Sequence, residues 1–492
     1  MTTTINLRKM LHRKSAEYCA PNPAGNTAAG TFIVSDKSNM IPTHDIAYYV
    51  GGVSAIWNYN ADQDAWVQLP NSGATGTFAA GACGEFRCVS APAGIIDLTP
   101  SGTGTTSTIP TSLTITRNME GCKVRVHVGT NVGYEGTIVS NTFGANATIT
   151  VTPAATSTFD NTTRYRVYGG SLWFMNAGTA AVGFSVYDRM TNTWTARSVT
   201  GLPTAWGTDA QLVSTPGIVS NNSAGFVNGT AIAGATSTTL PTGKTFLLNA
   251  WANYQVRIKS GTGIGQIRTI SSNTTPGVLT VSVAWTVTPD ATSVYVIEGN
   301  DDYFYLLGNA AVAMYRYSIS GNSWSTLAPT AARAAVTGAG MTADWIDNVS
   351  SSLWNQDVAP AHYTTTLFKQ NGRYIYSWRG AAGNVLDVYD IAANTWISGV
   401  AYGQQMETFT TGTCSVDLHG YIHIQKDATG RIYRFDVAKN VLEPFVLNPV
   451  PQGTAVAGDK MFMTTYKDGA AEINFLYTLG NTRPELTRWL VI

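Results

Sequence analysis

The stretch YDRMTNTW at residues 187–194 returns as YDIAANTW at residues 389–396. Each copy reads tyrosine, a polar residue, three further residues, asparagine, one residue and tryptophan. With aspartate allowed in place of asparagine, this spacing occurs four times, and we call it the blade signature: Tyr59 to Trp66, Tyr187 to Trp194, Tyr317 to Trp324 and Tyr389 to Trp396. A phrase repeated at fixed internal spacing indicates one structural unit that is used several times.

The residues of the signature predict a strand, a tight turn and a returning strand. The segment before the tyrosine is apolar or aromatic, as in residues 312–317, and favours a strand. Asp and Asn tolerate left-handed backbone and bond to their own main chain, so they can close a hairpin. The tryptophan begins the next strand and offers a large surface to bury. A unit of about four such strands cannot cover its own aromatic faces and must stack on its copies, as in a β-propeller.

A glycine lies nine residues before the tyrosine in three copies, at Gly178, Gly308 and Gly380. This pattern of glycine followed by Tyr-Asp-x3-Asn-x-Trp resembles the Kelch motif, which implies an all-β, Kelch-like β-propeller. Kelch repeats usually carry a double glycine, and here only Gly51-Gly52 lies near the expected place. Weaker copies of the signature follow at residues 435–442 and at Tyr477.

The number of blades follows from chain length. Roughly 258 residues remain for the propeller once the N-terminal arm, two inserted segments and one long loop are set aside. Six blades would take about 43 residues each and seven about 37, whereas a four-stranded blade needs roughly 40 or more. Six blades are therefore preferred, and seven are the alternative.

Two surplus segments between signature copies resemble each other. Val124-Arg-Val126 matches Val256-Arg-Ile258, and Gly129-Thr-Asn-Val-Gly133 matches Gly261-Thr-Gly-Ile-Gly265. We therefore predict a duplicated small β domain, inserted after blade one and again after blade two. Strands are expected on both sides of the glycines, which favours hairpin turns over a phosphate-binding loop, since that loop needs a following helix. The predicted organisation is an N-terminal arm with a short helix at 1–44, blade one at 45–92, inserted domain one at 93–168, blade two at 169–210, inserted domain two at 211–298 and the remaining blades at 299–492.

The N-terminal arm differs from the rest of the chain. Leu7, Leu11 and Tyr18 fall near one face of a short helix, with basic residues around it. A helix of this length is not stable alone. We expect it to dock on a neighbouring molecule, which makes the three residues candidate assembly contacts, and packing on its own propeller is the alternative.

Composition excludes several classes of partner. Lys plus Arg and Asp plus Glu number 30 each, so the net charge is zero, and only 12% of residues are charged. Such a chain gives no electrostatic reason to expect nucleic acid or an anionic membrane as partner. The five cysteines have irregular spacing and indicate free thiols made in a reducing cytosol. The N-terminus lacks a signal-peptide pattern, and no apolar run is long enough to span a membrane.

The sequence shows no catalytic set, so we expect a protein that is not an enzyme and needs no cofactor or metal. His419 and His423 share a strand face but lie about 13 Å apart, too far to chelate one metal. Kelch-type copper oxidases use histidines and a tyrosine joined to a cysteine, and no matching pair can be placed from sequence. Hydrolase, zinc-protease and P-loop motifs are absent from the sequence. The loop with Trp345 and Trp354 is the candidate contact loop, where aromatic rings could stack on sugar or pack on protein.

These features together resemble structural proteins of tailed-bacteriophage virions. The resemblance implies a subunit of the tail, neck or capsid exterior, made in the host cytoplasm and contacting copies of itself and other virion proteins. Phage proteins leave the cell by lysis, which would explain the free thiols and the missing signal. The alternatives are a tail protein that binds or degrades host-surface glycan, and a Kelch-type oxidase or adaptor.

Overall fold

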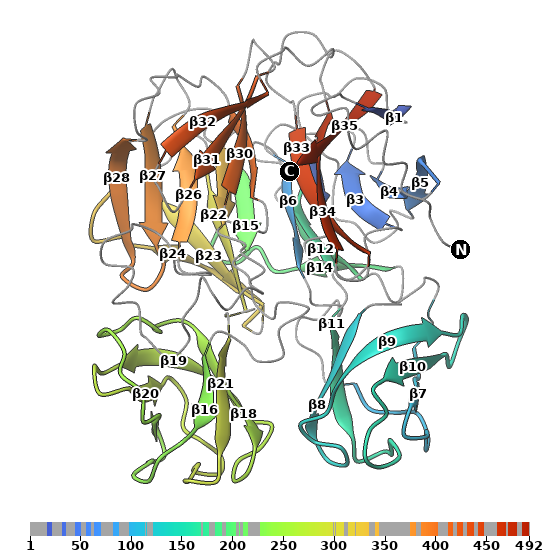
Figure 1. Cartoon of the computed structure of the whole chain (residues 1–492), viewed down its shortest axis with the longest axis vertical. Helices are drawn as coiled ribbons and strands as arrows, with labels where there is room; N and C mark the ends of the chain where they lie inside the picture. Colours follow the sequence, from blue (N-terminus) through green and yellow to red (C-terminus); the bar gives the residue numbers. More distant parts are fainter. Residues whose placement is uncertain are drawn as a thin grey trace.

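The structure is a computed structural model of the 492-residue chain (Figure 1). It describes the following residues: 17–21, 32–35, 45–50, 56–60, 63–69, 82–87, 98–113, 115, 122–168, 171–176, 183–188, 193–202, 206, 210–214, 227–298, 300, 302–308, 313–319, 321–333, 340–343, 374–379, 385–401, 412–416, 421–426, 431–436, 441–446, 460–468, 471–479 and 485–491. All regular elements in these ranges are β-strands. None of the described residues form a helix that is long and apolar enough to cross a membrane.

Six antiparallel sheets of four strands form the upper body of the molecule in Figure 1. The first sheet holds β2 (Phe32–Ser35), β3 (Asp45–Val50), β4 (Ile56–Asn60) and β5 (Ala65–Leu69). The second holds β6 (Cys83–Arg87), β12 (Ser171–Met175), β13 (Phe184–Asp188) and β14 (Thr193–Arg197). The third holds β15 (Gln211–Ser214), β22 (Tyr303–Leu307), β23 (Met314–Ser318) and β24 (Ser323–Leu327).

The other three sheets repeat this order. The fourth holds β25 (Gly340–Ala343), β26 (Tyr374–Trp378), β27 (Val385–Asp390) and β28 (Thr395–Ala401). The fifth holds β29 (Gly412–Val416), β30 (Tyr421–Lys426), β31 (Ile432–Asp436) and β32 (Val441–Val446). The sixth holds β33 (Lys460–Asp468), β34 (Ala471–Leu479), β35 (Glu485–Val491) and β1 (Glu17–Pro21).

The first strands of the six sheets gather around a common centre. They contact one another in the cyclic order β2, β6, β15, β25, β29, β33 and back to β2. The first strand of every sheet is therefore the innermost one, and the strand that carries the signature tryptophan is the outermost in four of the sheets. This all-β arrangement is β-propeller-like, as the repeated signature predicts. We call the six sheets together the ring.

The ring is closed by strands from opposite ends of the chain. β1 pairs antiparallel with β35, Glu17 opposite Arg488 and Pro21 opposite Glu485. Tyr18 therefore lies on a strand, and its prediction as part of a helix is wrong. The physical reason is that β35 has an open edge, and a strand placed there buries Cys19 in an apolar core. Leu7 and Leu11 lie outside the described residues.

Two further sheets lie below the ring and on the same side of it (Figure 1). We call them module 1 (residues 98–168) and module 2 (residues 227–298). Module 1 has the strand order β11 (Arg164–Tyr168), β8 (Lys123–Val128), β9 (Glu135–Asn141), β10 (Thr148–Thr152) and β7 (Thr108–Pro110). Module 2 has the order β16 (Val227–Thr230), β21 (Val294–Glu298), β18 (Gln255–Ser260), β19 (Ile267–Asn273), β20 (Val278–Val281) and β17 (Thr239–Pro241).

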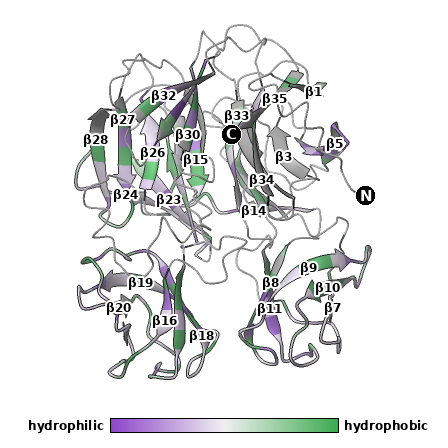
Figure 2. Ribbon diagram, in the orientation of Figure 1, coloured by the Kyte–Doolittle hydropathy of each residue, from purple (hydrophilic) through white to green (hydrophobic). Residues whose placement is uncertain are grey.

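The two modules share one fold. The extra strand of module 2 pairs Gly229 with Tyr295, and module 1 keeps a single bridge at the equivalent place, Leu98 with Tyr165. Each module has its own apolar core, separate from the cores of the ring. Figure 2 shows hydrophobic and hydrophilic residues interleaved in the ring and in both modules, which is typical of sheets that bury one face.

The chain enters the modules at a different place from the predicted one. Module 1 lies between β6 and β12, and module 2 between β15 and β22, so each joins the first and second strands of one sheet. The sequence instead predicts β6 in blade one and β15 in inserted domain two, so that both insertions would lie between blades. In both of these sheets the innermost strand precedes the module. It therefore lies far in sequence from the signature copy by which the other strands of the sheet can be recognised.

Candidate functional site

The four signature copies have the same geometry. In each copy the tyrosine and tryptophan face each other on paired strands, and their ring centroids are 5.0 to 5.2 Å apart. Both side chains are buried in every copy except the first, where Trp66 is half-buried. The tryptophans thus occupy equivalent places in four sheets and supply core surface, as predicted.

The acidic or amide residue of the signature does more than close a turn. Its backbone is left-handed at all three described copies, with φ of 46° at Asp64, 47° at Asn322 and 49° at Asn394. The signature tyrosine hydroxyl donates to its side-chain oxygen, at 2.6 Å from Tyr59, 2.8 Å from Tyr317 and 2.6 Å from Tyr389. Burial raises the pKa of each of these three tyrosines, so the hydroxyls remain proton donors at neutral pH. Asn192 of the remaining copy lies outside the described residues.

The same residue also binds the neighbouring sheet. Asp64 accepts the Ala20 backbone N–H at 2.7 Å, and Asn322 accepts that of Ser198 at 3.1 Å. Asn394 reverses the direction and donates to the Ala328 carbonyl at 3.0 Å. In each case the partner lies in or just after the outermost strand of the preceding sheet.

The signature tryptophans add a second contact of the same kind. Trp66 donates its indole N–H to the Ala20 carbonyl at 3.1 Å, while the backbone N–H groups of Trp324 and Trp396 donate to Thr200 and Ala331. The signature is therefore the junction between sheets, which explains why the chain repeats it.

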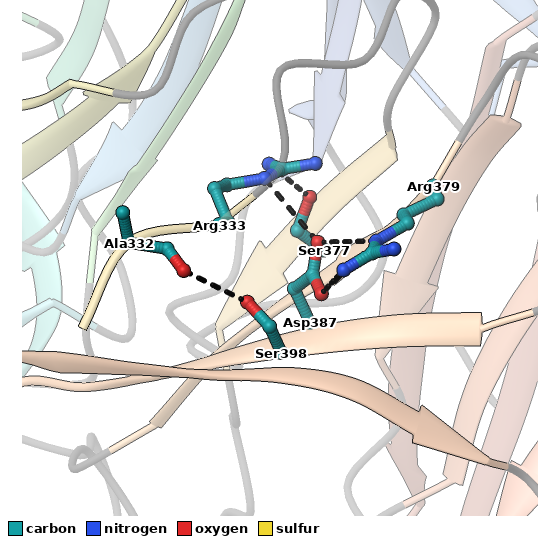
Figure 3. A network of polar contacts seen from close by, with 6 residues as sticks. All are labelled: Ala332, Arg333, Ser377, Arg379, Asp387 and Ser398. Carbon is teal, nitrogen blue, oxygen red and sulfur yellow. Dashed lines mark hydrogen bonds and ion pairs between the residues drawn. The ribbon is translucent and has the colours of Figure 1, made fainter.

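Charged side chains add a buried network at one such junction (Figure 3). Asp387 on β27 is fully buried and accepts three hydrogen bonds from Arg379, the shortest at 2.7 Å. Arg333, from the segment that links two sheets, lies 3.3 Å from the same carboxylate and donates to Ser377 at 2.9 Å. Its guanidinium also lies 5.1 Å from the ring centroid of Trp396. Burial lowers the pKa of Arg333, whose ion pair and hydrogen bond connect the segment between two sheets to the fourth sheet.

The structure brings together a cysteine and a tyrosine that the sequence does not pair. Cys19 and Tyr59 lie in one buried cluster with Tyr477 and Leu486, and the Cys19 side chain adds to the burial that raises the pKa of Tyr59. The two residues are 40 positions apart, and one of them lies on a strand that was predicted as a helix, so no sequence signal could join them. The described residues of this cluster include no histidine. Cys19, Cys83 and Cys122 are buried, and these three thiols are not joined in disulfides.

His423 lies on β30, opposite Arg434 of β31, and is fully buried. Burial, with a smaller contribution from the Arg434 charge, lowers its pKa to about 3, so the imidazole is neutral at physiological pH. His419 lies outside the described residues. Across the described part of the chain, no three His, Cys, Asp or Glu side chains gather as metal ligands would.

The glycine clusters of the modules lie in turns between strands, as expected. Gly129 and Gly261 have φ of 78° and 79°, and a Cβ at either would meet a backbone oxygen within 2.0 Å. Beside each turn an aspartate holds the loop: Asp160 accepts from Thr130 and Thr162, and Asp290 accepts from the equivalent Thr262 and Thr292. These hydrogen bonds lower the pKa of Asp160 to about 2 and that of Asp290 in the same direction.

Among the side chains that the structure describes, most of the large exposed apolar ones belong to the modules. Eleven large hydrophobic side chains are exposed among the described residues, and eight of them belong to the modules. Module 1 exposes Val128, Val139 and Phe143, and module 2 exposes Ile232, Leu247, Leu248, Val283 and Val287. Trp345 and Trp354 lie outside the described residues, in the segment that connects β25 to β26 in chain order.

No family model matches the chain, and no curated protein matches it. Among solved structures, YCF48 bound to a D1 peptide is similar over 98% of this chain and 96% of that one, with 7% identity and a TM-score of 0.32. A structural genomics protein of unknown function from Bacteroides thetaiotaomicron is similar over 98% of both chains, with 8% identity and a TM-score of 0.29.

Proposed function

We propose that this chain is a structural subunit of a tailed-bacteriophage virion, without catalytic activity. In this proposal it is a six-bladed, Kelch-like propeller with two inserted β domains, and it assembles in the tail, neck or capsid exterior. The modules make the contacts to copies of the chain and to other virion proteins, and the ring is the rigid body that carries them.

The observation that carries the proposal is the contrast between the two parts of the molecule. In the ring the charged and polar groups of the sheet junctions bind each other. On the modules, by contrast, Phe143 is 64% exposed and Leu248 is 67% exposed. Apolar side chains of this size are costly in water, and their grouping on two projecting domains is typical of surfaces that become covered on assembly.

Light scattering after size exclusion tests the proposal on the full-length chain. We expect concentration-dependent oligomers, which should weaken in Phe143→Ser and Leu248→Ser and persist in the matched ring variant Val67→Ser. Mass spectrometry of purified phage particles should detect the chain. A strictly monomeric protein that is absent from particles would contradict the proposal.

The second candidate function is binding or degradation of host-surface glycan. Its support is the place of the Trp345 and Trp354 segment, which joins the first and second strands of its sheet as each module does in its own. A glycan array and a polysaccharide-degradation assay test this alternative. Binding that is lost in Trp345→Ala and Trp354→Ala would favour it over the structural role.

A further inference from the structure

The two modules contact each other through equivalent loops. A Cβ placed on Gly133 of module 1 would lie 2.8 Å from the Lys259 carbonyl oxygen and 3.0 Å from Ile264 of module 2. A Cβ on Gly265 of module 2 would lie 2.1 Å from the His127 carbonyl oxygen and 3.1 Å from Val132 of module 1. Gly133 matches Gly265 in the duplication, His127 matches Lys259, and Val132 matches Ile264. The contact is therefore reciprocal, as in a two-fold symmetric dimer.

One ion-pair cluster breaks this symmetry. Glu135 of module 1 binds Arg125 of its own module at 3.2 Å and Arg257 of module 2 at 2.7 Å, through the same carboxylate oxygen. The two arginine side chains are 9% and 7% exposed and occupy equivalent places in the duplication. Module 2 has Ile267 where module 1 has Glu135. If module 2 paired with a second copy of itself, Arg257 would meet Ile267 in place of the Glu135 carboxylate.

We infer that the two modules act as one rigid unit, paired within the chain through a pseudo-two-fold interface whose specificity comes from Glu135. The loops at residues 129–133 and 261–265 give the fit, because both glycines that meet the other module have φ of 83° and no room for a side chain. The shared carboxylate selects module 1 as the partner of module 2, since breaking a mostly buried charge pair is strongly unfavourable. The outer surfaces of the modules are then held at a fixed spacing, which favours simultaneous binding at two places.

The duplication offers a matched pair of variants. Gly261→Ala and Gly265→Ala change the same loop, at φ of 79° and 83°, and bring a Cβ to 2.0 and 2.1 Å from a backbone oxygen. The oxygen near Gly261 belongs to Thr292 of the same module, whereas the oxygen near Gly265 belongs to His127 of the other module. Only the second variant should therefore disturb module 1.

Amide hydrogen exchange of the full chain, followed by mass spectrometry, reads the coupling. In Gly265→Ala we expect residues 123–134 of module 1 to exchange about tenfold faster, while Gly261→Ala leaves them unchanged. In Glu135→Gln, which keeps the side-chain shape, residues 255–265 of module 2 should exchange about tenfold faster. Glu135→Gln keeps the test valid if Gly265→Ala does not fold.

Unchanged exchange across the interface in the folded variants would overturn the inference. Protection that disappears on dilution of the wild-type chain would also overturn it, because pairing would then occur between chains. Both readouts are independent of whether the protein belongs to a virion.

Discussion

The ring and the module pair solve the same problem, joining neighbouring sheets, in opposite ways. In the ring one kind of junction is repeated: at the three fully described copies the tyrosine binds its Asp or Asn partner, and that partner and the tryptophan each bond to the preceding sheet. Between the modules the junction exists once, and it depends on Glu135, a position at which the two duplicated copies differ, since module 2 has Ile267 there. A repeated contact is therefore visible as a repeat in the sequence, whereas a unique contact depends on the place where the repeat is broken.

The largest effect is expected from removing the strand that closes the ring. Deletion of residues 1–21 removes β1, the pairing with β35 and the Ala20 partners of Asp64 and Trp66. We expect an aggregation-prone chain or a fall in Tm of about 10 °C or more, measured by calorimetry. Deletion of residues 1–16 is the control, and an equal loss of stability in that variant would contradict a specific role for β1.

A smaller but still large effect is expected at the buried charges. Asp387→Ala leaves Arg333 and Arg379 without their shared carboxylate, which should cost about 3–5 kcal/mol in the free energy of unfolding. Glu443→Ala breaks a more exposed pair with Arg434, at 2.8 Å, and should cost about 1 kcal/mol or less. Denaturant titration of both variants measures the two losses in the free energy of unfolding. Equal losses would contradict a larger contribution of the buried network in Figure 3 to stability.

Substitutions in the signature test whether its copies are interchangeable. Asn322→Ala removes the acceptor of Tyr317 and of the Ser198 N–H, and should cost about 2 kcal/mol in the free energy of unfolding. Asn322→Asp keeps both acceptors and copies the natural Asp64, so the cost should be about 1 kcal/mol or less. The idea of one shared junction fails if the aspartate variant is as unstable as the alanine variant.

The smallest effect concerns the modules and is a dependence on pH. The folded pKa of Asp160 is lowered to about 2, so its contribution to stability is present above the unfolded pKa, about 3.9, and is lost as the pH falls toward 2. An NMR titration should find this low pKa, and Thr130→Val should move it toward the ordinary value because a hydrogen bond to the carboxylate is lost. A titration near 3.9 in the wild type would contradict the hydrogen-bonded loop.

The signature allowed the β-propeller-like ring to be predicted, because each of its residues has a local preference that agrees with the fold. The left-handed Asn322 and the Tyr317–Trp324 pair follow from such preferences. The strand conformation of Tyr18 does not follow from local preferences, because β1 forms only when β35 lies beside it. The Arg333–Asp387 and Glu135–Arg257 ion pairs could not be predicted from the sequence either. Each joins elements whose relative placement depends on the completed ring.

The pairing of β1 with β35 also orders events during synthesis. Among the described strands of the ring, β1 is the first to be synthesised and β35 is the last. The β35 edge can therefore meet its partner only after every other described strand of the ring has been made. Closure of the ring is the last step of its assembly, and it requires that residues 17–21 stay available for pairing until then.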